Sequence, residues 1–444
     1  MLKLVDPTLN LFSYTLKQGL GVGEPETRKV YRRFLASLSA QLHKKLNVSF
    51  TPEQKQKFLA LHEETVADLP FTGNLNNHPV KVKGRYRRWN VSDNYQLLFD
   101  GYVDDKYQPD KVIKLIESLQ DLIPQPPKLE NIGKTWMLSG WLESGTDLEA
   151  AELAKQVYKC LFKKDGVSQG SGLFLGGKVA EFWGDKIEDN CQLLVILYPD
   201  EAACQEWARD FYVSWLDLLC FRHKIIWAYE NSLLLKERLV SNYNQIVGMR
   251  NTSRLNLKKL LEAMGKLSEF AIDLNYLELQ HSTINVNLEK YEAKLAEIQA
   301  KARSTDDLKF LQDFCDRAKQ HYPKQIQKDI DNFRPCLEIL RSLTDTIRGT
   351  VEIRKAESDR TFQTIVGIVG VGLSTAGTVG SAAANFKTEI EANPTINTAI
   401  NTFVPIFAPG SGLRVIMGFS ILSGIAASLL TWVIIGVCSR FFRR

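Results

Sequence analysis

The stretch FQTIVGIVGVGLSTAGTVGSAAA, residues 362–384, contains no charged side chain. A second uncharged run, VIMGFSILSGIAASLLTWVIIGVC, residues 415–438, follows after a short connection. At a rise of about 1.5 Å per residue, each run is long enough to cross a hydrocarbon core of about 30 Å. The sequence therefore predicts transmembrane helix 1 at residues 361–385 and transmembrane helix 2 at residues 413–439. The alternative, two buried core helices of a soluble protein, is disfavoured by their length and lack of charge.

Basic residues flank the two predicted spans unequally. Four of them precede the first span, namely Arg348, Arg354, Lys355 and Arg360, and three follow the second, namely Arg440, Arg443 and Arg444. Between the two uncharged runs, Glu389 and Glu391 of the loop, residues 386–412, offset the basic Lys387 and Arg414. Because basic segments stay in the cytoplasm, we expect an extracytosolic loop and two cytoplasmic termini, with residues 440–444 as a basic cytosolic tail. The predicted location is a bacterial-type inner membrane or its equivalent.

Composition excludes several classes of function. A formal net charge of +5 on 444 residues is too small to indicate nucleic acid as a partner, but it suits a protein beside anionic lipid. The seven cysteines form no CxxC pair and the six histidines no HxxxH pair. No Ser/His/Asp, Cys/His or paired-carboxylate set is distinguishable. The sequence predicts neither an enzyme nor a bound cofactor, although a divalent cation is a candidate transported or regulatory ion.

The chain before the membrane divides into three regions. Residues 1–130 form a poorly defined N-terminal cytosolic region, residues 131–200 an α+β domain and residues 201–360 a long helical stalk. Within the second region, Trp136–Leu142 has the pattern of a strand, and Thr146 with Glu149 forms a capping box for a helix that ends at Phe162. Two further strands are predicted at Leu173–Trp183 and Gln192–Tyr198. This order of elements is typical of an α+β fold.

The predicted stalk has a repeating apolar seam. Apolar residues recur at alternating intervals of three and four in two long runs, residues 267–298 and residues 326–351. A seam of this length indicates a long helix that packs along another helix, as in a coiled coil. The second run continues almost to the first predicted span, and Pro335 is its visible break. We therefore predict an α+β cytosolic domain, a coiled-coil stalk and two C-terminal transmembrane helices.

The N-terminal region contains one basic segment of interest. Helix-like stretches near Arg28–Leu46 and Pro52–Leu69 precede a segment whose charged and apolar residues alternate with the two-residue period of a strand. The candidate residues for a nucleotide or lipid headgroup are Lys81, Lys83, Arg85, Arg87 and Arg88. The alternative is an exposed strand face with no ligand.

The first predicted span carries two stripes of residues. Small side chains recur every four residues and allow another helix to approach closely; they are Gly372, Ala376, Gly380 and Ala384. A polar stripe, about 200° away at 100° per residue, consists of Ser374, Thr378, Ser381 and Asn385. Hydroxyl and amide oxygens suit the lining of a pore for hydrated ions. The alternative is that these hydroxyls bond to backbone carbonyls and help two spans associate.

This layout resembles the CorA-type divalent-cation transporters, which have a cytosolic α/β domain, a very long helix entering the first span, a short outer loop, a second span and a basic C-terminus. In that family the first span ends in Gly-Met-Asn, commonly followed by Phe. This chain has Ala383, Ala384, Asn385 and Phe386 there, so two positions match. The absence of the Gly and Met of this motif favours a divergent member of the family.

The resemblance implies a pentameric funnel whose pore is lined by the first span, with Asn385 at the outer mouth. The loop carboxylates Glu389 and Glu391 would then enrich cations near the pore. Our first hypothesis is accordingly an oligomeric channel or transporter, probed best by cation flux. The second is a membrane-tethered sensor or effector, whose cytosolic domain binds a nucleotide or a protein partner and whose spans anchor or disrupt the membrane.

Overall fold

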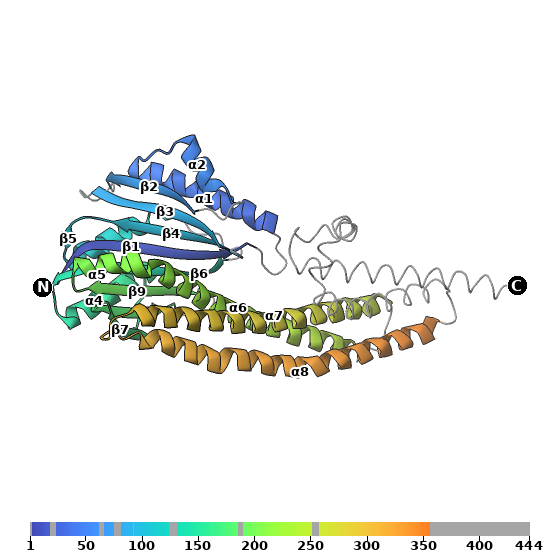
Figure 1. Cartoon of the computed structure of the whole chain (residues 1–444). Helices are drawn as coiled ribbons and strands as arrows, with labels where there is room; N and C mark the ends of the chain where they lie inside the picture. The colour runs from blue at the N-terminus through green and yellow to red at the C-terminus, as the bar shows by residue number, and fades with distance from the viewer. Residues whose placement is uncertain are drawn as a thin grey trace. The chain divides into compact units, whose positions relative to one another are not determined.

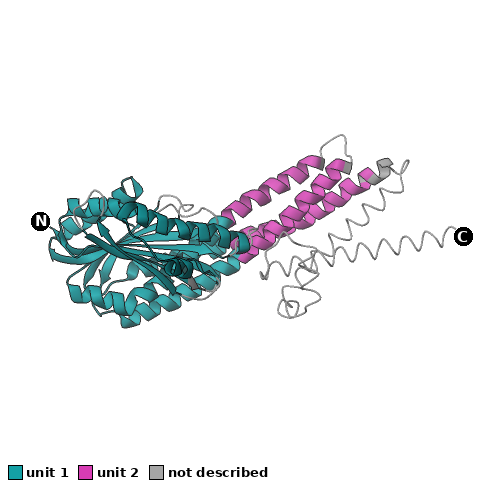
Figure 2. Ribbon diagram, turned by 90° about the horizontal axis from the view of Figure 1, so that it is seen from above, with its two compact units in different colours: residues 1–19, 25–231, 280–325 teal, residues 20–24, 232–279, 326–444 magenta. Residues whose placement is uncertain are grey.

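The computed structural model describes residues 2–17, 24–61, 66–74, 81–91, 93–123, 131–184, 190–250 and 257–355. Both predicted spans and the loop between them lie outside these ranges. Within the described part of the chain, no helix is both long enough and apolar enough to cross a bilayer. The described residues divide into two compact units: those within 1–19, 25–231 and 280–325 form the first, and those within 232–279 and 326–355 belong to the second (Figure 2).

The first unit is built on a mixed sheet. Nine described strands form it: β1 (Lys3–Leu16), β2 (Val66–Asn74), β3 (Lys81–Val91), β4 (Asn94–Tyr102), β5 (Lys106–Tyr107), β6 (Asn131–Ser144), β7 (Gly170–Phe174), β8 (Gly177–Trp183) and β9 (Cys191–Tyr198). The order is β2-β3-β4-β1-β6-β9-β8-β7, with β5 beside β1. The pair β6 and β9 is parallel, and the other pairs are antiparallel. Strands from residues 1–130 and from residues 131–200 thus belong to one sheet.

Helices cover both faces of this sheet. One face packs against α1 (Glu24–Leu46), α3 (Pro109–Gln120) and α4 (Asp147–Phe162) through a single apolar core, and α2 (Pro52–Leu59) adds Phe58 to it. Figure 1 shows α1 and α2 beside β2 and β3. On the other face, the Tyr14 hydroxyl donates to the carbonyl of Leu216 at 3.0 Å, and Phe12 meets Tyr212 edge to face. A strand such as β1 is therefore buried on both sides.

Within residues 131–200, the predicted strands at Trp136–Leu142 and Gln192–Tyr198 and the helix between them are confirmed, whereas the single strand predicted at Leu173–Trp183 is wrong, because a turn divides it between β7 and β8. Thr146 caps α4 with the reciprocal hydrogen bonds of a capping box, and the helix ends at Phe162. The glycine-rich stretch before Phe174 is strand β7, which pairs with β8 through a tight hairpin at Leu175 and Gly176. The predicted helix at Pro52–Leu69 is wrong beyond Leu59, because Val66–Asn74 pairs with β3 as strand β2. The alternating exposure of β2 follows from that pairing.

Long helices follow the sheet. After α5 (Glu201–Glu206) and a π-helical turn (Trp207–Phe211), the chain forms α6 (Tyr212–Arg250), α7 (Leu257–Lys301) and α8 (Lys309–Lys355). Most of the predicted seam of α7 is buried, from Phe270 to Ile298. α8 is helical throughout its length, and Pro335 lies in its interior. The coarse prediction of a sheet-containing region followed by long helices is confirmed.

Segments of these three helices form the second unit. Arg238 of α6 pairs with Asp273 of α7 at 2.6 Å, and Arg334 of α8 pairs with Glu278 of α7 at 2.9 Å. Between α7 and α8, Phe270 and Phe333 meet edge to face at 6.0 Å. A small apolar cluster adds to the packing; its members are Leu260, Ala263, Met264, Ile347 and Val351.

Candidate functional site

The basic segment predicted as a ligand site forms strand β3, and its cations mostly have protein partners. Lys83 pairs with Asp104. The guanidinium of Arg85 donates to Asp100 at 2.7 Å, and that of Arg87 binds both carboxylate oxygens of Asp68 at 2.8 Å. Hydrogen bonding from Arg87 lowers the pKa of Asp68. These cross-strand ion pairs neutralise the strand face.

The other two basic residues of β3 differ from each other in exposure. Lys81 is exposed at the start of the strand. Arg88 is completely buried, and its guanidinium donates to the backbone carbonyls of Phe58 at 2.9 Å and Lys57 at 3.3 Å. These carbonyls belong to the last turn of α2, and that of Lys57 also accepts from the backbone N–H of Ala60. Arg88 therefore holds the C-terminal end of α2 on the sheet.

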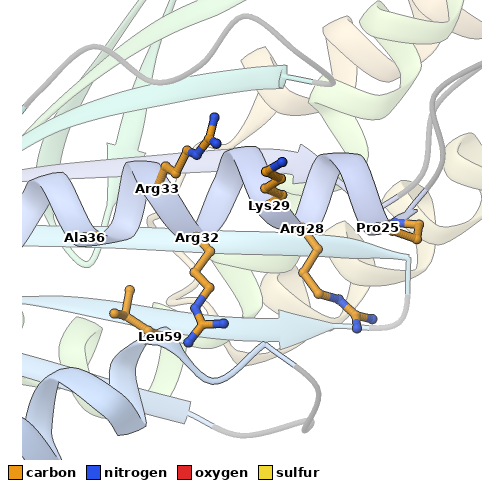
Figure 3. A pocket seen from close by; sticks show the side chains of 7 residues that line it. All are labelled: Pro25, Arg28, Lys29, Arg32, Arg33, Ala36 and Leu59. Carbon is orange, nitrogen blue, oxygen red and sulfur yellow. The ribbon is translucent and has the colours of Figure 1, made fainter.

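A pocket of about 430 Å³ lies between α1 and the end of α2. It is lined by Pro25, Arg28, Lys29, Arg32, Arg33, Ala36 and Leu59, and we call it the α1 pocket. Figure 3 shows the side chains of Arg28 and Arg32 on one side of α1, with Arg32 directed toward Leu59 and Arg33 on the other side of the helix. As far as the described residues go, no acidic side chain is part of this lining.

The buried face of α1 determines where these cations point. Tyr31 stacks on Tyr95 of β4 with a ring separation of 4.7 Å, and Phe34, Leu35 and Leu38 enter the same core. With 3.6 residues per turn, Arg32 and Arg33 then fall on the outer face of the helix, where both are exposed. Packing of the apolar face thus presents a row of cations to solvent.

The cations of the α1 pocket are arranged so that they repel one another. Arg28 and Arg32, like Lys29 and Arg33, are four residues apart, a spacing at which like charges destabilise a helix. Within the described chain, Lys29, Arg32 and Arg33 form no ion pair with a carboxylate. Elsewhere in the first unit, Lys106 pairs with Glu143 and Lys178 with Asp147. The α1 pocket therefore differs from the neutralised face of β3.

A buried polar network lies on the opposite side of the sheet. The Thr135 hydroxyl is 2.7 Å from Nε2 of His223 and 3.0 Å from Oε1 of Gln192, and Gln192 donates in turn to Glu181. Nε of Arg222 lies 3.7 Å from Oε1 of Glu181, and both side chains are about 2% exposed. Burial, with the charge of Arg222, lowers the pKa of His223. The network joins β6, β8 and β9 to α6.

Two aromatic rings enclose the buried guanidinium of this network. The Arg222 guanidinium carbon lies 4.9 Å from the ring centre of Phe314 and 5.2 Å from that of Trp183. Arg317 lies over Trp183 as well, at 4.8 Å. Because the side chains of this network are packed against other protein atoms, we interpret it as a structural link between the sheet and the long helices.

The remaining predicted site residues lie outside the described ranges. These are the stripe Gly372, Ala376, Gly380 and Ala384, the stripe Ser374, Thr378, Ser381 and Asn385, and the loop carboxylates Glu389 and Glu391. The described residues contain no group of three His, Cys, Asp or Glu side chains able to hold a metal ion.

The α1 pocket was not predicted from the sequence. Its signal was present in the spacing of Arg28, Lys29, Arg32 and Arg33 on a predicted helix. The approach of Leu59 from another helix is a tertiary feature without a local signal. No protein-family model, curated protein or solved structure matches the chain.

Proposed function

We propose that this protein is an oligomeric membrane channel or transporter of CorA-like plan, and that it conducts cations. The described residues form its cytosolic part, and the uncharged runs at residues 362–384 and 415–438 form its spans. The polar stripe from Ser374 to Asn385 lines the pore, because hydroxyl and amide oxygens stabilise a hydrated ion without placing a full charge in the membrane.

The observation that carries this proposal is the length of α8. This helix runs from Lys309 to Lys355 and ends, in sequence, shortly before the first uncharged run, which begins at Phe362. A helix that leads from a cytosolic unit toward a pore-lining span is the element through which such a unit would act on the pore. The mixed sheet followed by long helices agrees with the coarse plan that the proposal requires.

Flux through liposomes tests the proposal. We expect the purified full chain to pass Mg²⁺, Co²⁺ or a monovalent cation, and we expect Asn385→Ala to change the rate or the ion preference. Ser428→Ala, in the second predicted span, is the matched control and should leave both unchanged. No flux of any cation, or equal flux in the Asn385 variant, would contradict the proposed pore.

The oligomeric state in detergent is a second test. One lining helix per subunit encloses a central pore only if several subunits surround it, and the CorA-like plan requires five. Native mass spectrometry that finds a monomer or a dimer would therefore exclude this pore.

A second candidate function is a membrane-tethered protein that senses a cytosolic ligand. The α1 pocket favours it, because Lys29, Arg32 and Arg33 have no carboxylate partner among the described residues. Loss of flux together with retained ligand binding would favour this candidate over the channel.

A further inference from the structure

The α1 pocket is large enough for a small molecule and is lined by both basic and apolar side chains. Its volume of about 430 Å³ falls in the range of sites for small molecules. Four basic side chains line it, with Arg28 and Arg32 on one side of α1 and Lys29 and Arg33 on the other, while Pro25, Ala36 and Leu59 supply apolar surface. We infer that this pocket binds the phosphate groups of a small soluble polyphosphate, such as a nucleoside triphosphate.

The argument from charge rests on the contrast with β3. In β3 the guanidinium groups of Arg85 and Arg87 each have a carboxylate within 2.8 Å. In the α1 pocket, the described residues provide no carboxylate for Lys29, Arg32 or Arg33. Repulsion between cations one turn apart destabilises α1, and a bound anion removes this repulsion. A single phosphate is too small to reach cations spread over about one and a half turns, whereas a chain of two or three phosphates can.

The residue types also agree with phosphate as the ligand. Three of the four cations are arginines, whose planar guanidinium groups donate two parallel hydrogen bonds to phosphate oxygens. Figure 3 shows Arg28 and Arg32 extending from the same side of α1, so that both can contact one ligand. The end of α2 that carries Leu59 is fixed by Arg88, which gives the pocket a defined second wall.

The pocket lining argues for recognition through phosphate and against recognition through a base. Proteins that bind single-stranded nucleic acid stack the bases on aromatic side chains, and the α1 pocket is lined by none. Bound nucleotides therefore differ little in affinity when only the base changes. ATP, GTP and inorganic pyrophosphate should bind within a few-fold of one another, and binding should weaken as salt is added.

Binding measurements on the full chain in a nonionic detergent test this inference. The probes are ATP, GTP and inorganic pyrophosphate, titrated by calorimetry at low and moderate ionic strength. Wild-type protein should show saturable binding, and Arg32→Gln/Arg33→Gln should weaken it by at least about tenfold, the loss of one charge-assisted hydrogen bond. Arg32→Lys/Arg33→Lys keeps the charge without the planar donors and should give an intermediate affinity.

The matched control removes two exposed lysines elsewhere in the first unit, Lys44→Gln/Lys111→Gln, and should bind like wild type. An equal loss in this control would overturn the inference, since net charge alone would then explain binding. Absence of saturable binding to all three probes would also overturn it. Binding only to vesicles that contain phosphatidylglycerol would overturn it as well, because the ligand of the pocket would then be a lipid surface and not a soluble polyphosphate. Calorimetry is independent of cation flux, so its failure leaves the proposed channel untouched.

Discussion

Nδ1 of His223 lies 2.8 Å from the side-chain oxygen of Asn190, in the interior of the first unit. The amide nitrogen of Asn190 donates to the carbonyls of Ile132 at 2.6 Å and of His223 at 2.8 Å, so its oxygen must face the ring. Nδ1 therefore carries a proton. On the other side of the ring, Nε2 lies 2.7 Å from the Thr135 hydroxyl, which donates to Oε1 of Gln192 at 3.0 Å.

The first prediction is that His223 makes the fold sensitive to acid. Burial and the charge of Arg222 lower the pKa of His223 in the folded protein, whereas the ring takes up a proton near pH 6.5 when unfolded. Below that pH the unfolded chain binds more protons, so stability falls as the pH falls. His223→Gln should lower stability at pH 8 by about 1–3 kcal/mol. The substitution should also reduce the further loss of stability as the pH falls from 8 to 5.5.

Denaturant unfolding across this pH range measures both effects. His281→Gln, at a partly exposed position of α7, is the control and should retain the wild-type pH dependence. An unchanged pH dependence in His223→Gln would mean that His223 does not cause the acid sensitivity.

The second prediction concerns the buried pair of Arg222 and Glu181. Removing one member of a buried ion pair leaves the other charge without compensation, so Arg222→Met should cost about 3–5 kcal/mol. Arg222→Met/Glu181→Met leaves no uncompensated charge. Its cost should therefore be smaller than the sum of the two single changes. A double-mutant cycle on urea unfolding gives the coupling energy, and additive costs would show that the two side chains act independently.

Local sequence signals predicted the elements whose determinants lie within a few residues. The capping box of Thr146 and Glu149 located the start of α4, because both hydrogen bonds join residues three apart. The seam of α7 predicted the buried positions from Phe270 to Ile298 for the same reason, since residues three and four apart share one helix face.

The central strands gave no comparable signal. β1 is covered by helices on both faces, so its apolar residues do not alternate with exposed polar ones. Its polar side chains Asn10, Ser13 and Thr15 are themselves buried, which obscures the pattern further. Partner choice is equally nonlocal: Arg87 meets Asp68 because β2 and β3 pair in the register that places these residues opposite each other. The α1 pocket likewise depends on where α2 ends on the sheet.

The third prediction compares two capping boxes, one with a titrating carboxylate as its acceptor and one with a neutral amide. α4 is capped by Thr146 with Glu149, and α2 by Thr51 with Gln54, which does not titrate. The hydrogen bond from the Thr146 backbone lowers the pKa of Glu149, so its contribution is present above the unfolded pKa and is lost as the pH falls through the folded pKa. Glu149→Gln should therefore reduce the loss of stability between pH 6 and pH 3.

The reciprocal change at the other helix should do the opposite. Gln54→Glu places a titrating acceptor in the α2 box and should increase the loss of stability between pH 6 and pH 3. Circular dichroism during thermal unfolding at these two pH values records both changes. If the loss of stability between pH 6 and pH 3 changes in the same direction in both variants, surface charge rather than capping controls this pH dependence.

The fourth prediction compares two glycines in opposite surroundings. A Cβ on Gly84 of β3 would lie 2.1 Å from the carbonyl oxygen of Asp100 and 2.6 Å from the Phe71 ring, so neighbouring strands would have to separate. Gly84→Ala should thus destabilise the protein by about 1–3 kcal/mol, the usual cost of overpacking. A Cβ on Gly248 of α6 meets no atom within 4 Å. Gly248→Ala should stabilise by about 1 kcal/mol, because alanine favours a helix interior.

The position of Gly84 adds a local readout. Its neighbour Arg85 lies opposite Asp100 in the β3–β4 register, and Asp100 contributes the carbonyl that the new methyl group would strike. Separating these strands weakens the ion pair between Arg85 and Asp100, so hydrogen exchange of the β3 and β4 amides should accelerate in Gly84→Ala and stay unchanged in Gly248→Ala. If exchange is unchanged in both variants, the sheet accommodates the methyl group without strand separation, and the close approach at Gly84 is not what requires glycine there.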